Sequence, residues 1–308
     1  MKDHLPFAGG GAWYKGNMHT HTTDSDGCYS PERTVERYRD IGYSFLCTTD
    51  HRQYNYNKHL EREGFAIIPG SEVDLNPPGG ALCHHLVAFR SEECERNYPD
   101  GHRYMEPQWR GEGTVQGVID ELNARGNLVI YCHPVWSKTE LADFSGLHGL
   151  FGMEVYNTGC HVANNTGHAE IYLDSLFRRK RLRNAFATDD NHKEYDIGGG
   201  WICVKCGELS ERALVDAMKA GAFYSSTGPE IYDFGVREGS VFIECSEVKE
   251  IRFTSFEQFG HNYMAPKGQT LGRAEHKISG GETYIRVECV DQCGMKAWTN
   301  AVYIDNLL

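Results

Sequence analysis

Histidines and carboxylates recur beside the short apolar runs of this chain. His19 and His21 form an H-x-H pair, and alternate residues of an extended chain point to the same side, so two imidazoles can hold one ion. Residues of the same kind follow at Asp26, Asp50-His51, Glu72, His84-His85, His133 and Asp189-Asp190-Asn191-His192. One histidine beside a strand is usually a packing residue. So many at corresponding strand ends predict a metal site.

The donor types narrow the choice of metal. The set holds imidazoles and carboxylates but no thiolate, which favours manganese, iron or zinc. Leaving Asp50 aside and counting one residue from His84-His85 and one from Asp189-Asp190, the set has nine members. Nine donors are too many for one ion, so two or three divalent ions are expected. The C-x-x-C of Cys203 and Cys206 has no second pair to complete a four-thiolate zinc site, and we interpret it as part of a strand.

Apolar runs alternate with helical patterns up to about residue 224. The strand candidates are 17–20, 45–49, 66–69, 85–89, 127–132, 152–156 and 183–187. Helices are expected after Ser30-Pro31, from Thr114 to Gly126 and from Ser210 to Gly221. Strands that alternate with helices predict a parallel sheet with covered faces, and about seven such units predict a closed or nearly closed α/β barrel.

In such a barrel the strand ends of one polarity meet at one face, so the candidate ligands would share a cleft. His85 fits less simply because it lies near the start of its run, which requires a short or irregular strand. After residue 224 short alternating runs at 240–245, 250–254, 283–290 and 298–304 predict a small antiparallel sandwich-like β domain. We therefore expect a barrel domain at 1–224 and a β domain at 225–308.

Composition excludes several classes of protein. The 308 residues carry 31 Lys and Arg against 43 Asp and Glu, a net charge of −12, and 40% of them are hydrophobic, as in an ordinary globular protein. Neither a spanning apolar segment nor a signal peptide is evident, so we expect a cytoplasmic protein that does not enter a membrane. An acidic chain without a basic stripe argues against a nucleic-acid polymer as partner. An anionic substrate then needs positive charge from another source.

Taken in order, the motifs resemble those of the PHP family, named for polymerases and histidinol phosphatases. They are His19-x-His21, Asp26-Gly27, Thr49-Asp50-His51, Gly70-x-Glu72, His85, His133-Pro134 and Asp189-x-x-His192. The resemblance covers roughly residues 13–224 and implies a distorted (β/α)7 barrel with a trinuclear metal site. The run Gly221–Pro229 and the tail motif Asp291-x-x-Gly294-x-x-Ala297-Trp298 are similar to the branch that includes carbaryl-hydrolase-type metallohydrolases.

The resemblance also implies how the ligands divide among the ions. His19, His21 and Asp189 would hold one ion, with Glu72 bridging to a second that also takes His85 and His133. Asp26, His51 and His192 would hold the third. We prefer His85 to His84 because His85-Leu-Val-Ala-Phe matches a run of the family, and Asp189 to Asp190 because Asp189 directly follows the strand.

Three ions against the three carboxylates would leave a net charge of about +3, which would attract a phosphate ester. The expected function is that of a metal-dependent phosphoesterase (EC 3.1) in which a metal-bridging hydroxide attacks a small phosphate ester. Asp189 or His192 would carry the proton, and Arg52 and His161 would contact substrate. Two alternatives are a hydrolase of carbamates or other carboxylic esters, favoured by an aromatic cleft, and a non-catalytic binding module. The sequence does not predict the oligomeric state.

Overall fold

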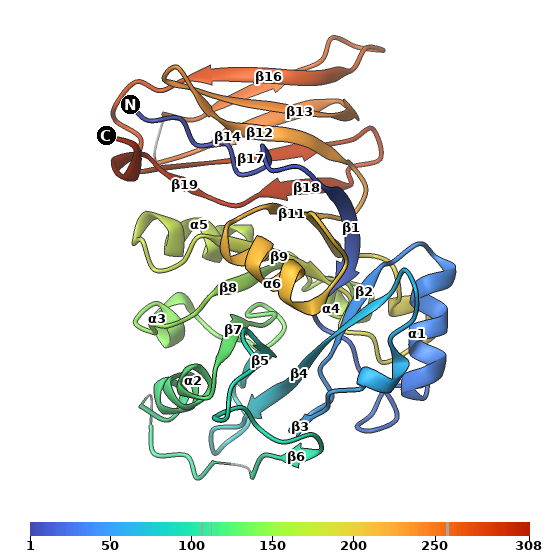
Figure 1. Ribbon diagram of the computed structural model, residues 1–308. Helices are drawn as coiled ribbons and strands as arrows, with labels where there is room; N and C mark the ends of the chain where they lie inside the picture. The colour runs from blue at the N-terminus through green and yellow to red at the C-terminus, as the bar shows by residue number, and fades with distance from the viewer. Residues whose placement is uncertain (106, 112, 257–258) are drawn as a thin grey trace.

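The computed structural model describes residues 1–105, 107–111, 113–256 and 259–308. A strand lies at six of the seven predicted runs, and the first strand precedes its predicted run 17–20, sharing only Asn17 with it; the seven strands lie side by side in chain order (Figure 1). They are β1 (Ala12–Asn17), β2 (Phe45–Thr48), β4 (Ala66–Leu75), β5 (His84–Arg90), β7 (Asn127–Tyr131), β8 (Gly152–Asn157) and β9 (Asn184–Thr188). The α/β class and the barrel expected from the sequence are therefore confirmed.

The barrel is distorted because its ends meet without a full ladder of hydrogen bonds. A single parallel bridge joins Thr20, after β1, to Asn191, after β9. Two further strands, β10 (Trp201–Cys206) and β11 (Phe223–Ser226), extend the sheet antiparallel beyond β1. Ser225 on β11 reaches β9, where its hydroxyl donates to Ala185 O and accepts from Ala187 N.

Helices cover the barrel, and the first two and the last of them in the chain are those that the sequence predicts. They are α1 (Pro31–Asp40), α2 (Gly113–Ala124), α3 (Leu141–Phe144), α4 (Thr158–Asn164), α5 (Glu170–Arg178) and α6 (Glu211–Lys219). The Ser30 side chain caps α1 by accepting from Arg33 N. Between β2 and β4 the chain forms only the short strand β3 (Gln53–Tyr54), which pairs with β6 (His102–Arg103), and the turn η1 (Lys58–Leu60).

Strand β5 runs against its neighbours. It pairs antiparallel with both β4 and β7, and the connection from β4 contains the turn residues Pro77-Pro78-Gly79-Gly80 in place of a helix. The start of β5 therefore lies at the same edge as the ends of its parallel neighbours. This direction explains His85, for which the sequence required a short or irregular strand; β5 is neither.

The C-terminal region is a sandwich of two antiparallel layers. One layer contains β12 (Ile231–Arg237), β13 (Ser240–Val248) and β16 (Leu271–Lys277); the other contains β14 (Glu250–Thr254), β15 (His261–Met264), β17 (Tyr284–Val290) and β18 (Lys296–Thr299). Ile243 from the first layer and Ile251 and Val287 from the second share one buried core. A short β19 (Val302–Tyr303) and the turn η4 (Ile304–Leu307) follow. The sandwich-like domain is confirmed.

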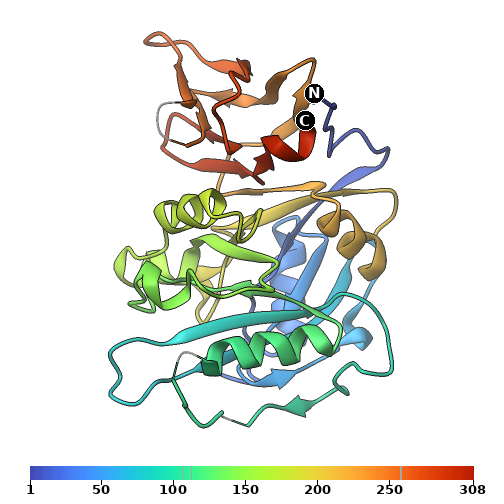
Figure 2. The ribbon, with the colours of Figure 1, turned by 90° about the vertical axis from the view of Figure 1, so that its left-hand side faces the viewer.

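The two regions are joined at both ends of the barrel sequence. β18 pairs with β11, so the barrel sheet continues into the sandwich. Residues before β1 lie on the sandwich, where Lys2 N donates to Leu307 O and Phe7 enters the sandwich core. Both termini accordingly lie together on that domain (Figures 1 and 2). The division at residue 224 remains a prediction.

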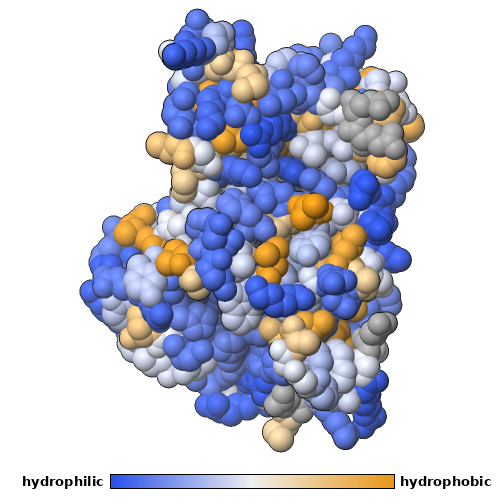
Figure 3. Space-filling model, turned by 180° about the vertical axis from the view of Figure 1, so that it is seen from behind, coloured by the Kyte–Doolittle hydropathy of each residue, from blue (hydrophilic) through white to orange (hydrophobic). Residues whose placement is uncertain are grey.

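The surface and the cysteines are unexceptional. Viewed from behind, the molecule is mainly hydrophilic, with hydrophobic side chains in separate patches (Figure 3). Among the residues described, no helix has both the length and the apolar character needed to cross a membrane. The cysteines are unpaired, and Cys203 and Cys206 are buried on β10 as the strand interpretation predicts.

Candidate metal centre

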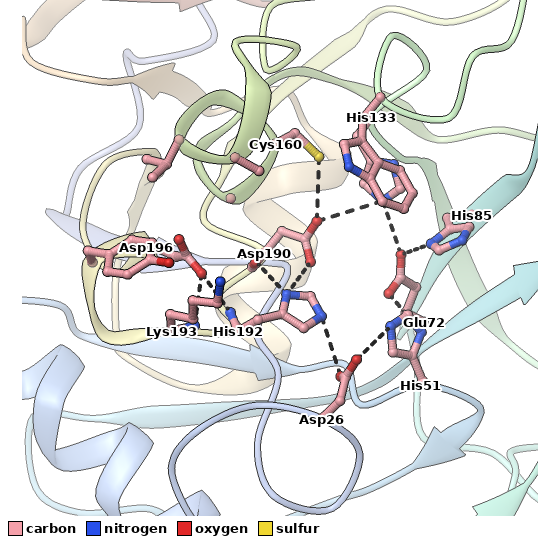
Figure 4. A pocket seen from close by; sticks show the side chains of 15 residues that line it. Asp26, His51, Glu72, His85, His133, Cys160, Asp190, His192, Lys193 and Asp196 are labelled. Carbon is pink, nitrogen blue, oxygen red and sulfur yellow. Dashed lines mark hydrogen bonds and ion pairs between the residues drawn. The ribbon is translucent and has the colours of Figure 1, made fainter.

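The predicted ligands except Asp189 converge at one edge of the barrel, and Figure 4 shows six of them, which are Asp26, His51, Glu72, His85, His133 and His192. His19 and His21 follow β1, His51 follows β2, His133 follows β7, Glu72 lies on β4 and His85 begins β5. His19, His21 and Glu72 are almost completely buried. Ordinary packing does not bring this many titratable side chains together, because a buried charge is costly unless it is paired.

Four atoms form the tightest group. The Nε2 atoms of His19 and His21 lie 3.2 Å apart. Each lies 3.1–3.3 Å from Glu72 Oε2 and Asp190 Oδ1. These five separations are close to those between ligand atoms that surround one tetrahedral ion at about 2.0–2.1 Å. This group has the size of a single ion site.

Glu72 stands at the centre of the cluster. Its Oε2 also lies 3.2 Å from His51 Nδ1, while its Oε1 lies 2.8 Å from His85 Nδ1 and 3.3 Å from His133 Nε2. The two oxygens therefore face different groups of histidines, as a bridging carboxylate would. The structure brings together the donors predicted for the second ion.

The donors predicted for the third ion lie nearer the surface. His192 Nε2 is 3.3 Å from Asp26 Oδ1, and His51 Nε2 is 3.9 Å from Asp26 Oδ2. His21 Nδ1 is 3.7 Å from the same carboxylate. Asp26 is exposed, with 56% of its side chain accessible, so this group forms the open side of the centre.

The choice of Asp189 over Asp190 is wrong in geometry. Asp190 enters the cluster, whereas the Asp189 carboxylate faces the opposite way and lies outside it. Its oxygens accept five hydrogen bonds, from Gly198 N, Gly199 N, Gly200 N, Thr158 Oγ1 and Tyr38 Oη. Burial raises the pKa of Asp189 to about 6, although these donors act to lower it. We call Asp189 with Gly198–Gly200 the Asp189 cradle.

The cradle leaves Asp189 no free oxygen, and Asp189 does not line the cavity beside the cluster, so it cannot carry a proton to a substrate there. Asp190 has a left-handed backbone with φ 50°, which a non-glycine residue adopts only where the surroundings enforce it. Its N–H donates to His19 O at 2.9 Å, and this contact turns the Asp190 side chain toward β1.

Of the two histidines at the start of β5, His85 is the one that faces the cluster. Successive residues of a strand face opposite sides, so only one of the two reaches Glu72. His84 lies on the other side, where its Nδ1 is 2.8 Å from the Tyr131 hydroxyl and its ring stacks on Trp109.

The predicted substrate contacts Arg52 and His161 do not line the cavity. Arg52 forms an ion pair with Asp74, its Nε lying 2.8 Å from Asp74 Oδ1. The His161 ring packs against Tyr156 and His168, with ring centroids 5.5 Å away in both cases. Both residues therefore have structural contacts of their own.

Sequence reasoning gave no role to Glu154, which lies directly behind the cluster. Its Oε1 is 2.7 Å from His19 Nδ1 and its Oε2 accepts from His133 N at 2.8 Å. A charged residue in the middle of the buried strand β8 was the available signal, because glutamate is rarely buried without partners.

The imidazoles and carboxylates of the cluster strongly shift one another's pKa. Burial favours the neutral forms, but Asp190, Glu72 and Glu154 together raise the pKa of His19 well above its ordinary value. Burial likewise acts to raise the pKa of Glu72, yet His19, His51 and His85 hold it well below the usual range. The cluster therefore requires positive charge, supplied by protons on imidazoles or by cations that replace them.

A cavity of about 540 Å³ opens onto the cluster. Seven of the candidate ligands line it, and the remaining wall consists of Trp136, Gly159, Cys160, Val162, Ala163, Lys193, Tyr195 and Asp196. Small and apolar residues of α4 form one side. Lys193 is the only lysine or arginine among the described lining residues.

Two further observations indicate that these donors suit divalent ions. Glu72 Oε2, Asp190 Oδ1 and His51 Nδ1 are buried and have no hydrogen-bond partner, a costly state for polar atoms that coordination would relieve. These atoms face one another, and imidazole and carboxylate donors suit manganese, iron and zinc.

Comparisons with known proteins agree with the resemblance seen in the motifs. No family model matches the chain. The DNA polymerase/3′-5′ exonuclease PolX of Bacillus subtilis is 32% identical over 83 residues, covering 21% of this chain and 15% of that protein. The chain thus spans only 15% of the length of this curated relative.

Two solved structures are similar in fold. One is a two-domain protein of Bacteroides vulgatus that contains a predicted PHP-like metal-dependent phosphoesterase, with 17% identity, coverage of 97% of this chain and 98% of that one, and a TM-score of 0.47. The other, from Bifidobacterium adolescentis, is described only as a proposed metal-dependent phosphoesterase, with 15% identity, coverage of 58% of this chain and 88% of that one, and a TM-score of 0.42.

The chain is similar to PHP-like proteins. At 15–17% identity the likeness to the two solved structures is one of fold.

Proposed function

We propose that the chain is a PHP-family hydrolase that cleaves a small phosphate ester at a centre of two or three divalent ions. The single observation that carries the proposal is Glu72, whose buried carboxylate lies within 3.3 Å of nitrogen atoms of five histidines. A carboxylate surrounded by five imidazoles is better explained as a ligand that bridges two ions than as a residue that only packs.

The proposed ligand sets follow the three groups of donors. His19, His21, Glu72 and Asp190 would hold the first ion; Glu72, His85 and His133 the second; and Asp26, His51 and His192 the third. Manganese, iron or zinc suits these donors. When bound, the ions would supply positive charge and a water of lowered pKa for the attack.

The residues of the cavity perform the remaining tasks. Three divalent ions against the carboxylates of Asp26, Glu72 and Asp190 would leave about +3, which attracts an anionic ester into an acidic protein. Lys193 lies on the cavity wall beside His192 and would bind an oxygen of the substrate. With only the first two ions bound, His192 on the open side would be free to move a proton, with Asp26 holding its imidazole.

A second candidate function is hydrolysis of a carbamate or other carboxylic ester. The observation that favours it is the apolar part of the wall, where Trp136, Val162 and Tyr195 are partly exposed. A complete set of donors beside a cavity argues against a non-catalytic binding module. A small-molecule substrate and a cytoplasmic location remain part of the proposal, and unpaired cysteines accord with a reducing compartment.

Metal analysis and a hydrolysis screen test the proposal together. We expect two or three equivalents of manganese, iron or zinc per chain, and Mn²⁺-dependent cleavage of phosphomonoesters or phosphodiesters in preference to aryl carbamates. Glu72→Ala should abolish cleavage while the far-ultraviolet circular dichroism stays unchanged. A fully active preparation without metal would refute the proposal. Preferential cleavage of the carbamates would establish the second candidate.

A further inference from the structure

Glu154 is a buried carboxylate that faces no solvent and does not line the cavity. It lies in the middle of β8, its neighbours on that strand are buried, and only 1% of the residue is exposed. An isolated carboxylate in such a place would be expelled or neutralised. Its position therefore depends on the groups that surround it.

Each oxygen of Glu154 accepts two hydrogen bonds. Oε1 accepts from His19 Nδ1 at 2.7 Å and from the Thr188 hydroxyl at 2.6 Å. Oε2 accepts from His133 N at 2.8 Å and from Asn157 Nδ2 at 2.9 Å. The four donors come from three strands or their ends and from the residue that caps α4. All four fall within the range of strong, charge-assisted hydrogen bonds.

The first of these bonds orients His19. A proton on Nδ1 that is donated to Glu154 leaves the Nε2 lone pair directed at Glu72 and Asp190. Histidine ligands of metals commonly donate their other N–H to a carboxylate in this way, which fixes the tautomer and the ring orientation.

The bonds of Oε2 act on two further candidate ligands. The backbone of His133 is left-handed, with φ 27°, and its N–H is held by Glu154. Asn157 Nδ2 donates both to Glu154 and, at 3.0 Å, to Asp190 Oδ2. One carboxylate on β8 thus fixes His19 after β1, His133 after β7 and, through Asn157, Asp190 after β9.

We propose that Glu154 is a positioning residue of the metal centre, which sets the His19 tautomer and the placement of His133 and Asp190. This inference rests on the proposed function, because it presupposes that the cluster binds ions. A glutamine at this position would be nearly isosteric, but its NH₂ group would face two donors and its single oxygen would serve only the other two.

The chain offers a matched control. Thr188→Val removes one of the four hydrogen bonds to the same carboxylate without altering a bond to any candidate ligand. Loss of general packing around Glu154 would affect both variants, whereas loss of ligand positioning would affect Glu154→Gln alone.

Isothermal titration of the full chain with Mn²⁺, after removal of metal by a chelator, measures the effect. We expect Glu154→Gln to weaken the tightest site by about 10- to 100-fold, the usual cost of removing an outer partner of a ligand. Thr188→Val should bind close to wild type, while thermal unfolding of the metal-free proteins reports any shared loss of stability. Wild-type affinity in Glu154→Gln, or an equal loss in both variants, would overturn the inference.

A measurement on the wild type covers the case in which Glu154→Gln fails to fold. Nitrogen-15 NMR of the Zn²⁺-loaded protein should show the His19 proton on Nδ1. A proton on Nε2 would overturn the inference. If the wild type binds neither Mn²⁺ nor Zn²⁺, the proposed function fails and this inference with it. Binding by the wild type with no effect of the substitution refutes only the role of Glu154.

Discussion

Asp189 and Asp190 are neighbours in the chain, and both are buried, yet they have opposite surroundings. Asp189 accepts five hydrogen bonds within its cradle. Asp190 faces His19, His21 and Glu72, and its Oδ1 has no hydrogen-bond partner. The comparison distinguishes two kinds of buried carboxylate: one whose oxygens are filled by donors of the chain, and one with an oxygen that has no donor, where a cation would fit.

The pKa values of the pair express the same contrast. Burial acts to raise both, and it prevails at Asp189, whose pKa rises to about 6. At Asp190 the histidines His19, His21 and His133 outweigh burial and the charge of Glu72, and they hold its pKa well below the ordinary value. Substituting the two aspartates in turn therefore distinguishes a loss of metal affinity from a loss of folding stability.

Asp190→Asn should have the largest effect. Because Asp190 supplies a donor of the first group, we expect Mn²⁺ affinity to fall by about 100-fold or more, beyond the loss typical of outer partners. The metal-free variant should also lose some stability, because His19, His21 and His133 hold the Asp190 pKa below its ordinary value and so stabilise its charge in the fold. Calorimetric titration and urea unfolding after chelation measure the two quantities. A fall in stability with unchanged affinity would reverse the roles of the two aspartates.

Asp189→Asn should act mainly on stability. The amide cannot accept all five donors, and buried N–H groups of Gly198–Gly200 would lose a charged acceptor, so we expect the free energy of unfolding to fall by about 3 kcal/mol. Urea unfolding of the metal-free variant measures this. Mn²⁺ affinity should fall less than in Asp190→Asn; an equal or greater fall would show that the cradle is part of the centre.

Glu170 provides a third case, a carboxylate satisfied by a cation at the junction with the sandwich. It lies 2.6 Å from Lys296 Nζ and 3.2 Å from His168 Nδ1. Burial acts to raise its pKa, but these partners lower it to about 2. Because the folded pKa lies below the unfolded one, the stabilisation is present above about pH 4.5 and is lost as the pH falls toward about 2.

The expected size of this pH effect is about 2 kcal/mol. Between about pH 4.5 and about pH 2 the wild type should lose about 2 kcal/mol more of its free energy of unfolding than Glu170→Gln loses. Urea unfolding at several pH values measures both. Glu36→Gln is the control, since Glu36 pairs with Arg33 at an exposed site, where an ion pair contributes little. Parallel pH profiles of wild type and Glu170→Gln would contradict the assignment.

Much of the architecture and of the ligand set was predictable because it depends on local pattern. The strands follow from apolar runs, α1 from Ser30-Pro31, and the grouping of His19, His51 and His133 from their places after strands. The geometry agrees for Asp26, Glu72 and His192 as well, although ligand binding itself remains a prediction.

What could not be predicted depends on contacts between distant segments. Asp189 and Asp190 are both acidic residues next to a strand end, and only the amides of Gly198–Gly200, which come from a later loop, distinguish them. The direction of β5 had a readable signal. The chain between Leu75 and His84 is too short for a crossover helix and contains Pro-Pro-Gly-Gly, which indicates a hairpin.

The N-terminal segment has a consequence for how the protein is made. Lys2 bonds to Leu307, His4 bridges Val236, and Phe7 fills the sandwich core. A ribosome releases these early residues long before it synthesises their partners, and domains tend to fold in the order of synthesis. This segment therefore stays unpaired until the sandwich strands have been synthesised, so the joining of sandwich to barrel is a late event in folding.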